Sequence, residues 1–343
     1  MAEPMYVPRK NARIEPVVPD ARTAQGWFDL GERVPYDPRR KRIVAATDRA
    51  GDSNDVVKAF RRVVSESDRA GVGWTTFLPG FPDGSYGWEA VERHLGEDGP
   101  APRLFVEYIG QGDSDKPAEH PYGTVERADL VEAHWRQLDV RSTFLVSFDY
   151  SSIVALELLS RQLDRIEAGA ELGTRIEGVL SINGGLFADG HSHPVLTTPL
   201  LKTRLGRIGT WLAQRSPFVF DQMMKPLWSE EYGVTDDELG EVREAITRRD
   251  GAAFMSRAAG FVDEHKANAE RWDLRRLFLA LRDSVSFHLV GSENDQFEPN
   301  QIARARERLG EQGIDIRMVP GGHMTTSEQP ELLAAIILET VRA

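Results

Sequence analysis

Short apolar runs alternate with amphipathic segments along much of this chain of 343 residues. Runs rich in β-branched and aromatic residues predict strands, and apolar residues spaced three and four apart predict helices. The expected strands are 27–32, 42–46, 74–78, 103–108, 142–146, 178–182, 285–290 and 314–319. The expected helices are 57–67, 87–95, 124–138, 152–165 and 330–341. Repeated alternation of this kind predicts an α/β protein with a mostly parallel, eight-stranded sheet and helices on both faces.

The strand pattern is absent between residues 187 and 276, where amphipathic helical segments such as 200–215 and 236–249 replace it. We expect this block to form a helical cap inserted after the sixth strand. The segments 26–186 and 277–343 then form one core domain, and residues 1–25 form an irregular arm. Ligands of such sheets bind at the carboxyl ends of the strands, so the cap would cover the site.

Composition narrows the class of protein. The formal net charge of −12 disfavours nucleic acid and anionic membranes as partners. The chain has no cysteine, which excludes disulfides, thiolate metal ligands and cysteine nucleophiles and fits a cytoplasmic location. We find no signal peptide and no apolar run of the roughly 20 residues that a membrane span needs. We therefore expect a soluble cytoplasmic protein, and a homodimer is compatible with the sequence.

The segment 144–155 carries the strongest chemical signal. An apolar strand passes into a helix through one sharp turn, and Asp149 lies at its tip. Such a nucleophile elbow needs small residues beside the nucleophile, and Ser147 and Ser151 can fill those positions. An aspartate nucleophile forms an ester whose alkyl part comes from the substrate, so its targets are electrophilic sp³ carbons, as in epoxides or alkyl halides. The alternative is that Asp149 only caps the helix that follows.

Two backbone N–H groups are expected to form an oxyanion hole beside Asp149. Gly80 follows an expected strand and leaves room for the N–H of Phe81 to face the reacting centre. Tyr150, the residue after the nucleophile, supplies the second N–H.

An acid and a base follow at the ends of the last two expected strands. Asp295 is the candidate acid that orients a histidine, with Glu293 and Asp189 as alternatives. His323 follows two glycines and is the candidate base, with an ordinary loop histidine as the alternative. The order nucleophile, acid and base along the chain is the one found in a large class of α/β enzymes with catalytic triads.

Two other motifs carry weaker signals. His191 and His193 have a spacing that can indicate metal ligands, but no carboxylate pattern accompanies them. We therefore expect a solvated loop there, with no metal and no other cofactor in the protein. The glycine-rich segment 110–115 lacks the Gly-Lys-Ser/Thr ending and the following helix of a phosphate-binding loop.

The segments 79–88, 110–117, 147–151, 181–187 and 322–323 together resemble the epoxide hydrolase and haloalkane dehalogenase branch of the α/β-hydrolase superfamily. Within this branch the chain is most similar to the mesoderm-specific transcript protein group, over residues 27 to the C terminus without 52–72 and much of the cap. The resemblance implies the α/β-hydrolase fold. Because epoxide hydrolases usually carry cap tyrosines that donate to the epoxide oxygen, it also implies Tyr232 as a proton donor, with a packing role as the alternative.

The chain departs from the usual pattern of this branch at five positions. Proline, phenylalanine and serine stand at positions 79, 148 and 151, where the branch usually has histidine, histidine and glycine. Tyr150 and Phe81 stand where dehalogenases usually hold halide with tryptophan and asparagine. The resemblance therefore favours a hydrolase of small, apolar, epoxide-like substrates. Haloalkane dehalogenation is one alternative, and a catalytically silent protein that binds a small ligand is another.

Overall fold

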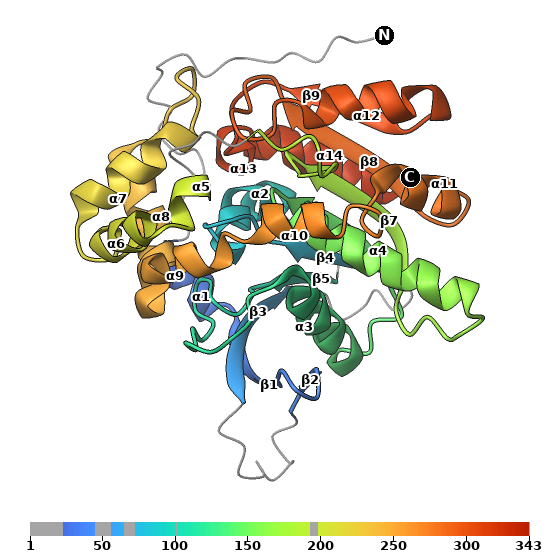
Figure 1. Ribbon diagram of the computed structural model, residues 1–343, viewed down its shortest axis with the longest axis horizontal. Helices are drawn as coiled ribbons and strands as arrows, with labels where there is room; N and C mark the ends of the chain where they lie inside the picture. The colour runs from blue at the N-terminus through green and yellow to red at the C-terminus, as the bar shows by residue number, and fades with distance from the viewer. Residues whose placement is uncertain (1–22, 45–55, 65–72, 101, 193–197, 343) are drawn as a thin grey trace.

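The computed structural model describes residues 23–44, 56–64, 73–100, 102–192 and 198–342. A nine-stranded sheet crosses the molecule with helices on both faces (Figure 1), in the order β2-β1-β3-β5-β4-β6-β7-β8-β9. Strands β2, β1, β3 and β5 pair antiparallel, and all pairs from β5 to β9 are parallel. The strands are β1 (Glu32–Asp37), β2 (Arg42–Ile43), β3 (Val57–Val64), β4 (Trp74–Leu78), β5 (Arg103–Val106), β6 (Ser142–Phe148), β7 (Arg175–Ile182), β8 (Ser286–Ser292) and β9 (Asp315–Val319). The expected fold class, a mostly parallel α/β sheet, is confirmed.

The first part of the sheet differs from the expectation. Residues 57–64, expected to be helical, form strand β3, because their mostly buried side chains fit between β1 and β5. The sheet therefore has nine strands instead of eight, and the long helical insertion follows the seventh strand. Residues 27–29, expected in a strand, belong to helix α1 (Ala24–Asp29), which Thr23 caps through a hydrogen bond from Gly26.

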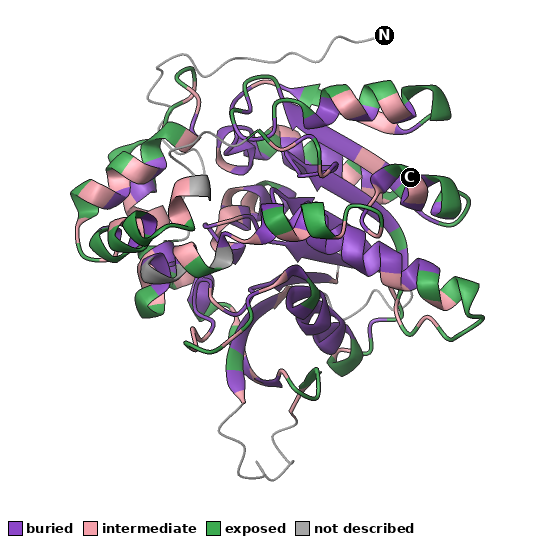
Figure 2. Ribbon diagram, in the orientation of Figure 1, coloured by how far each residue is buried: buried purple, intermediate pink, exposed green. Residues whose placement is uncertain are grey.

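Helices cover the two faces of the sheet and bury two apolar layers. One layer holds α3 (Thr124–Gln137), α4 (Ser151–Glu167), α11 (Leu274–Leu281) and α12 (Gln301–Leu309). The other holds α1, α2 (Glu89–Leu95) and α14 (Pro330–Arg342), with the short α13 (Thr325–Glu328) before α14. The strands are buried along most of their length (Figure 2). The sheet is therefore a rigid base for the loops at its carboxyl edge.

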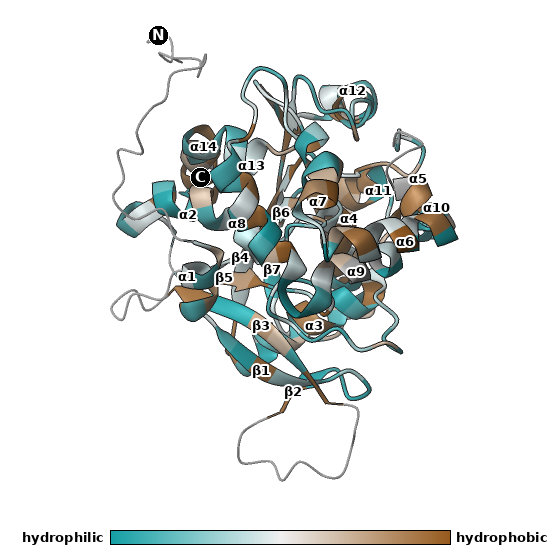
Figure 3. Ribbon diagram, turned by 90° about the vertical axis from the view of Figure 1, so that its left-hand side faces the viewer, coloured by the Kyte–Doolittle hydropathy of each residue, from teal (hydrophilic) through white to brown (hydrophobic). Residues whose placement is uncertain are grey.

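In the described chain, seven α-helices lie between β7 and β8: α5 (Thr198–Leu201), α6 (Arg204–Ala213), α7 (Pro217–Met224), α8 (Asp236–Thr247), α9 (Gly251–Ala258), α10 (Phe261–Ala267) and α11, which packs against the sheet. Helices α5 to α9 form a group at the left of Figure 1, and Figure 3 views the molecule from that side. That residues 187–276 form a separate cap domain stays a prediction. Of the expected arm, residues 1–22 lie outside the described residues. No helix in the described ranges is long and apolar enough to cross a membrane.

Candidate active site

The turn between β6 and α4 has the geometry of a nucleophile elbow. Asp149 has a φ of 54°, in the left-handed region that residues other than glycine rarely adopt. Its side chain is buried and makes no capping hydrogen bond to α4, whose N-cap residue is Tyr150. The helix-cap alternative is therefore wrong for this side chain. The strained turn instead presents the carboxylate to the groups at the carboxyl edge of the sheet.

The serine that replaces the usual glycine of the elbow has a structural role. Ser151 is fully buried, and its hydroxyl donates to the carbonyl oxygen of Pro79 in the turn after β4. The same hydroxyl lies 3.1 Å from the hydroxyl of Tyr108. The replacement therefore ties the elbow to the turn that carries Phe81 and leaves the elbow intact.

The N–H of Phe81 donates to Asp149 Oδ2 at 3.0 Å. A Cβ atom at Gly80 would lie 2.5 Å from the ring of Phe148 and 2.8 Å from Asp83 Oδ1, so this turn requires glycine. The expected second donor, the N–H of Tyr150, lies at the start of α4, where backbone N–H groups have no partner within the helix. That these two N–H groups act as an oxyanion hole stays a prediction.

The structure brings the three expected polar side chains together. His323 Nδ1 lies 3.0 Å from Asp295 Oδ1, and His323 Nε2 lies 3.5 Å from Asp149 Oδ1. All three residues are buried, and Asp295 Oδ1 also accepts the N–H groups of Phe297 and Glu298. His323 therefore lies between two carboxylates, which is the arrangement of a catalytic base, its orienting acid and a nucleophile.

The two alternative acids do not take this place. Glu293 is exposed, and the half-exposed carboxylate of Asp189 binds the guanidinium groups of Arg304 and Arg308 on α12. The hypothesis that His323 is an ordinary loop histidine is also wrong, since its ring is buried and paired on both sides.

The two carboxylates determine the charge of His323. Burial opposes the charged form of the ring, but the negative charges of Asp295 and Asp149 outweigh burial and raise the pKa of His323 well above its ordinary value. The neighbouring carboxylates therefore favour the protonated, imidazolium form of His323.

Two residues that the sequence did not single out hold the histidine loop in place. Asn183, directly after β7, donates to the carbonyl oxygen of His323 at 2.9 Å and accepts the N–H of Ser292 at 2.8 Å. Glu328 accepts the N–H of Gly322 at 2.6 Å and the N–H of Ser229, in the segment before α8, at 2.7 Å. A polar residue before two glycines at a strand end is the signal that could have pointed to Asn183. At Glu328 the sequence shows only the start of the last helix, which does not point to a role in the site.

A further buried acid next to the nucleophile also escaped the sequence analysis. Asp83 is 2% exposed, and neither of its carboxyl oxygens has a hydrogen-bond partner among the described residues. Burial, reinforced by the negative charge of Asp149, raises the pKa of Asp83 to about 7. The site therefore contains a carboxyl group that is largely neutral below that pH.

Aromatic rings surround the charged groups. The rings of Phe81, Tyr150 and Phe261 contact one another, with centroids 5.3 to 6.1 Å apart, and Phe261 comes from α10. The ring of Phe297 lies 4.8 Å from that of His323. These contacts bring an apolar surface from the helical insertion to the nucleophile, which suits a small apolar ligand.

Tyr232 is not brought into hydrogen bonding with the other expected site residues. Its hydroxyl is buried and has no hydrogen-bond partner within the described part of the chain. Its backbone N–H lies 3.4 Å from Ser229 Oγ, next to the contact of Ser229 with Glu328. The role of Tyr232 as a proton donor therefore stays a prediction.

The expected solvated loop at His191 is wrong. The side chain of His191 is 2% exposed, with Nδ1 2.7 Å from Glu298 Oε1 and Nε2 2.9 Å from Nδ1 of His265 on α10. The sequence could not show this, because the carboxylate lies 107 positions further along the chain. His193 lies outside the described residues. In the ranges that the structure describes, no group of three or more candidate ligands could hold a metal ion.

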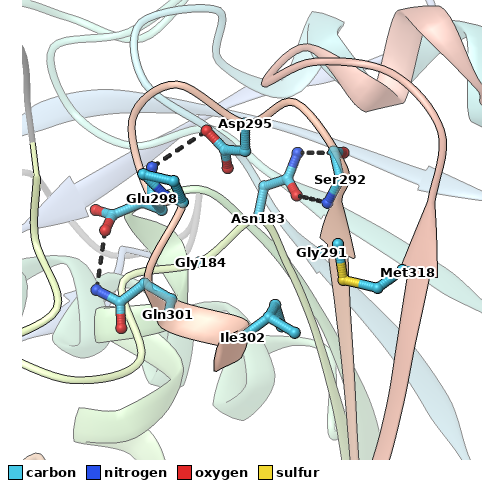
Figure 4. Close-up of a pocket in the computed structure, with 10 residues that line it drawn as sticks. Asn183, Gly184, Gly291, Ser292, Asp295, Glu298, Gln301, Ile302 and Met318 are labelled. Atoms are coloured by element: carbon cyan, nitrogen blue, oxygen red, sulfur yellow. Dashed lines mark hydrogen bonds between the residues drawn. The ribbon is translucent and has the colours of Figure 1, made fainter. Parts of the chain in front are cut away.

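A small pocket lies behind the acid of the site (Figure 4). Its lining includes Asn183, Asp295, Glu298, Gln301 and Ile302 but not Asp149. Gln301 donates to Glu298 Oε2 at 2.9 Å, and Figure 4 shows how these polar groups face one another. The pocket therefore lies among the residues around Asp295, and Asp149 is not part of its lining.

A mostly parallel sheet with an elbow after β6 and an acid and a histidine after β8 and β9 defines the α/β-hydrolase class of fold and site. The chain belongs to the alpha/beta hydrolase family, whose model matches residues 77–336. This confirms the superfamily that the sequence motifs indicated.

Individual relatives agree with this assignment. The mesoderm-specific transcript protein of Mus musculus is 31% identical over 199 residues, which is 57% of each chain. A putative hydrolase, LipZ, of Mycobacterium tuberculosis is 27% identical over 57% of this chain and 64% of its own. The chain thus spans a little more than half the length of the mammalian relatives that it matches. Among solved structures, the haloalkane dehalogenase DatA of Agrobacterium tumefaciens superposes with a TM-score of 0.62 at 19% identity, covering 92% of this chain and 97% of its own.

Proposed function

We propose that the protein is a hydrolase that opens small, apolar, epoxide-like substrates through a covalent ester on Asp149. The observation that carries the proposal is the position of this carboxylate. Phe81 N–H holds Oδ2 at 3.0 Å, so Oδ1, which faces His323 at the longer distance of 3.5 Å, is the proposed attacking oxygen. Attack by Oδ1 forms a C–O bond to the epoxide carbon and breaks the ring C–O bond.

Formation of the ester makes the site less negative, which favours the neutral form of His323. Formation of the ester removes the negative charge of Asp149, which is one cause of the raised pKa of His323. His323 can then release its proton, which balances the proton that the alkoxide takes up. Tyr232, with its buried and unpartnered hydroxyl, is the proposed donor to that alkoxide.

The neutral imidazole is the base of the second step. Oriented by Asp295, His323 takes a proton from water, and the resulting hydroxide adds to the ester carbonyl carbon. The negative charge that develops on Oδ2 is stabilised by the N–H of Phe81, with Tyr150 N–H as the proposed second donor. Collapse of this intermediate releases a diol and restores the carboxylate of Asp149.

Hydrolysis of carbon–halogen bonds is the second candidate, supported by the structural likeness to a haloalkane dehalogenase. It would use the same nucleophile and base. Phenylalanine and tyrosine at positions 81 and 150 offer no side-chain N–H to a leaving halide, which favours the epoxide.

The mechanism is tested by trapping the ester. His323→Gln should still allow attack but not hydrolysis, so intact-protein mass spectrometry with styrene oxide should show an adduct of one substrate mass. The matched control is the double variant Asp149→Asn with His323→Gln, which should stay unmodified. If the wild type turns over styrene oxide but His323→Gln shows no adduct, the covalent mechanism is wrong.

Two further measurements separate the alternatives. Release of chloride from 1-chlorohexane, with no turnover of epoxides, would replace the epoxide assignment by dehalogenation. Thermal stabilisation by styrene oxide that survives Asp149→Asn, with no turnover of any epoxide or chloroalkane, would show a protein that only binds its ligand.

A further inference from the structure

Large apolar side chains point into solvent along α6 and the start of α7. Ten large apolar residues in the described chain are 36% exposed or more, and five of them lie within residues 205–218. These five are Leu205, Ile208, Trp211, Leu212 and Phe218, with exposed fractions of 71, 55, 49, 41 and 72%. We call these five side chains the α6–α7 face. Clustering of this kind in one segment marks an interaction surface.

Helix α6 buries its small residues and exposes its large apolar ones, which is the reverse of an ordinary surface helix. Its buried residues are the small Gly206, Thr210 and Ala213, and it packs against α7 and α9. A Cβ atom at Gly206 would lie 2.2 Å from the carbonyl oxygen of Leu200, so the helix needs a glycine for this close approach. A surface helix normally buries its large apolar residues. Here the small residues make the contact with the protein, and the large ones remain available to a partner.

Positive charges predominate around the α6–α7 face, because the acids beside it, Asp221 on α7 and Asp263 on α10, pair with Arg243 and Lys202. Lys202, Arg204, Arg207 and Arg215 lie in or beside it, and the sequence has no acidic residue between 198 and 220. Lys202 pairs with Asp263, and Arg215 stacks on Trp211 with its guanidinium carbon 4.2 Å from the ring centre. Arg204 and Arg207 form no ion pair with any described residue. This local excess of cations stands out in a chain with a net charge of −12.

We propose that the α6–α7 face docks on the surface of an anionic lipid bilayer. Amphipathic helices with arginine beside tryptophan and leucine lie in the plane of the bilayer interface, where both the apolar side chains and the cations find partners. Tryptophan in particular favours the interface, because its ring is apolar and its N–H is polar. The net negative charge does not prevent this, since charges further away than the Debye length of roughly 8 Å are screened at physiological salt.

The proposal does not depend on the chemistry of Asp149, and it revises the expectation from net charge that membranes are excluded as partners. It is tested by sedimentation of the full chain with vesicles of phosphatidylcholine alone or mixed equally with phosphatidylglycerol. Binding should be at least about tenfold tighter to the anionic vesicles and should weaken as salt is added. Ile208→Ser combined with Trp211→Ser, and separately Arg204→Glu combined with Arg207→Glu, should each weaken it by about tenfold or more.

Matched controls keep the test specific. Ile166→Ser removes a side chain that is 46% exposed on α4, and Arg306→Glu reverses an exposed charge on α12. Neither should change binding. Because all substituted side chains are exposed, the melting temperatures of the variants should match that of the wild type.

Three results would overturn the proposal. The first is no binding to anionic vesicles. The second is equal binding by the wild type and the two double variants. The third is a concentration-dependent dimer in gel filtration that Ile208→Ser with Trp211→Ser abolishes, without vesicle binding, since the partner would then be a second copy of the chain.

Discussion

Two buried carboxylates in the loop after β8, Asp295 and Glu298, each pair with an imidazole from another segment. The two pairs differ in what the second ring nitrogen of the histidine faces. In one pair, Asp295 is 3.0 Å from His323 Nδ1, and His323 Nε2 faces the carboxylate of Asp149 at 3.5 Å. In the other, Glu298 is 2.7 Å from His191 Nδ1, and His191 Nε2 faces the ring of His265 at 2.9 Å. The acid–histidine geometry is nearly the same in both.

The group that faces the second ring nitrogen distinguishes the two pairs. A second carboxylate raises the pKa of His323 and places the ring beside a candidate nucleophile. At the other pair, burial and the neighbouring His191 lower the pKa of His265 to about 3, so this ring stays neutral at physiological pH. That pair therefore joins α10 to the loop after β8, and the ring nitrogens of His191 face Glu298 and His265 instead of a candidate nucleophile. A close acid–histidine contact alone does not identify a catalytic base.

The largest contrast is expected in turnover. His323→Gln should lower kcat for an epoxide by about 10²- to 10⁴-fold, because the base of the hydrolytic step is lost. His191→Gln should leave kcat close to the wild-type value, since its ring faces a histidine of α10 instead of Asp149. Steady-state kinetics of both variants with the same substrate check this. Equal losses of kcat would remove the distinction between the two pairs.

Asp83 extends the comparison to a carboxyl group that has no hydrogen-bond partner among the described residues. The pKa of Asp83 is raised from 3.8 to about 7 in the folded state, so the folded protein holds this proton more tightly than the unfolded chain does. The resulting contribution to the free energy of unfolding is complete below pH 3.8 and is lost as the pH rises through 7. In Asp83→Asn the side chain at position 83 cannot ionise, so the variant is the reference that lacks this pH dependence. Between about pH 4 and pH 8 the wild type should therefore lose roughly 4 kcal/mol of unfolding free energy relative to the variant.

Chemical denaturation of the wild type and Asp83→Asn across this pH range measures the effect. Burial also raises the pKa of Glu107 to about 7, and the charge of Asp83 adds to that shift, so the measured difference includes a smaller change at Glu107. A difference that does not change with pH would show that Asp83 is ionised throughout or has a partner.

His191→Gln should lower the free energy of unfolding although it leaves kcat unchanged. The substitution takes the imidazole partner away from Glu298 and His265, which are both buried. Leaving buried polar groups without partners costs about 1–3 kcal/mol of unfolding free energy. Thermal or urea unfolding provides the measurement, and a loss of kcat without a loss of stability would contradict the structural role.

The sequence predicted those parts of the molecule that depend on neighbouring residues. The elbow at Asp149, the turn at Gly80 and Phe81, and the loops of Asp295 and His323 each follow a strand within a few residues, so their local patterns were sufficient. Their order along the chain then implied that the fold brings them together.

The parts that were missed depend on contacts between distant segments. The segment of β3 was expected to be helical because of its spacing, but Arg61 and Arg62 in it are buried and pair with Glu32 and Glu92. His191 looked solvated because its acid is remote in the sequence. A carboxylate without a partner, such as Asp83, cannot be recognised before its surroundings are known.

The smallest effect is expected at Asp189, which the sequence left open as the orienting acid. Its carboxylate is 55% exposed and binds Arg304 and Arg308, so Asp189→Asn should cost only about 0–1 kcal/mol of unfolding free energy. The hydrogen bond from Arg308 lowers the pKa of Asp189, so this contribution exists above pH 3.8 and disappears as the pH falls further.

Turnover should be unchanged in Asp189→Asn and strongly reduced in Asp295→Asn, whose neutral side chain no longer stabilises the imidazolium of His323. The reverse result in a kinetic comparison would mean that the acid of the site had been assigned to the wrong loop.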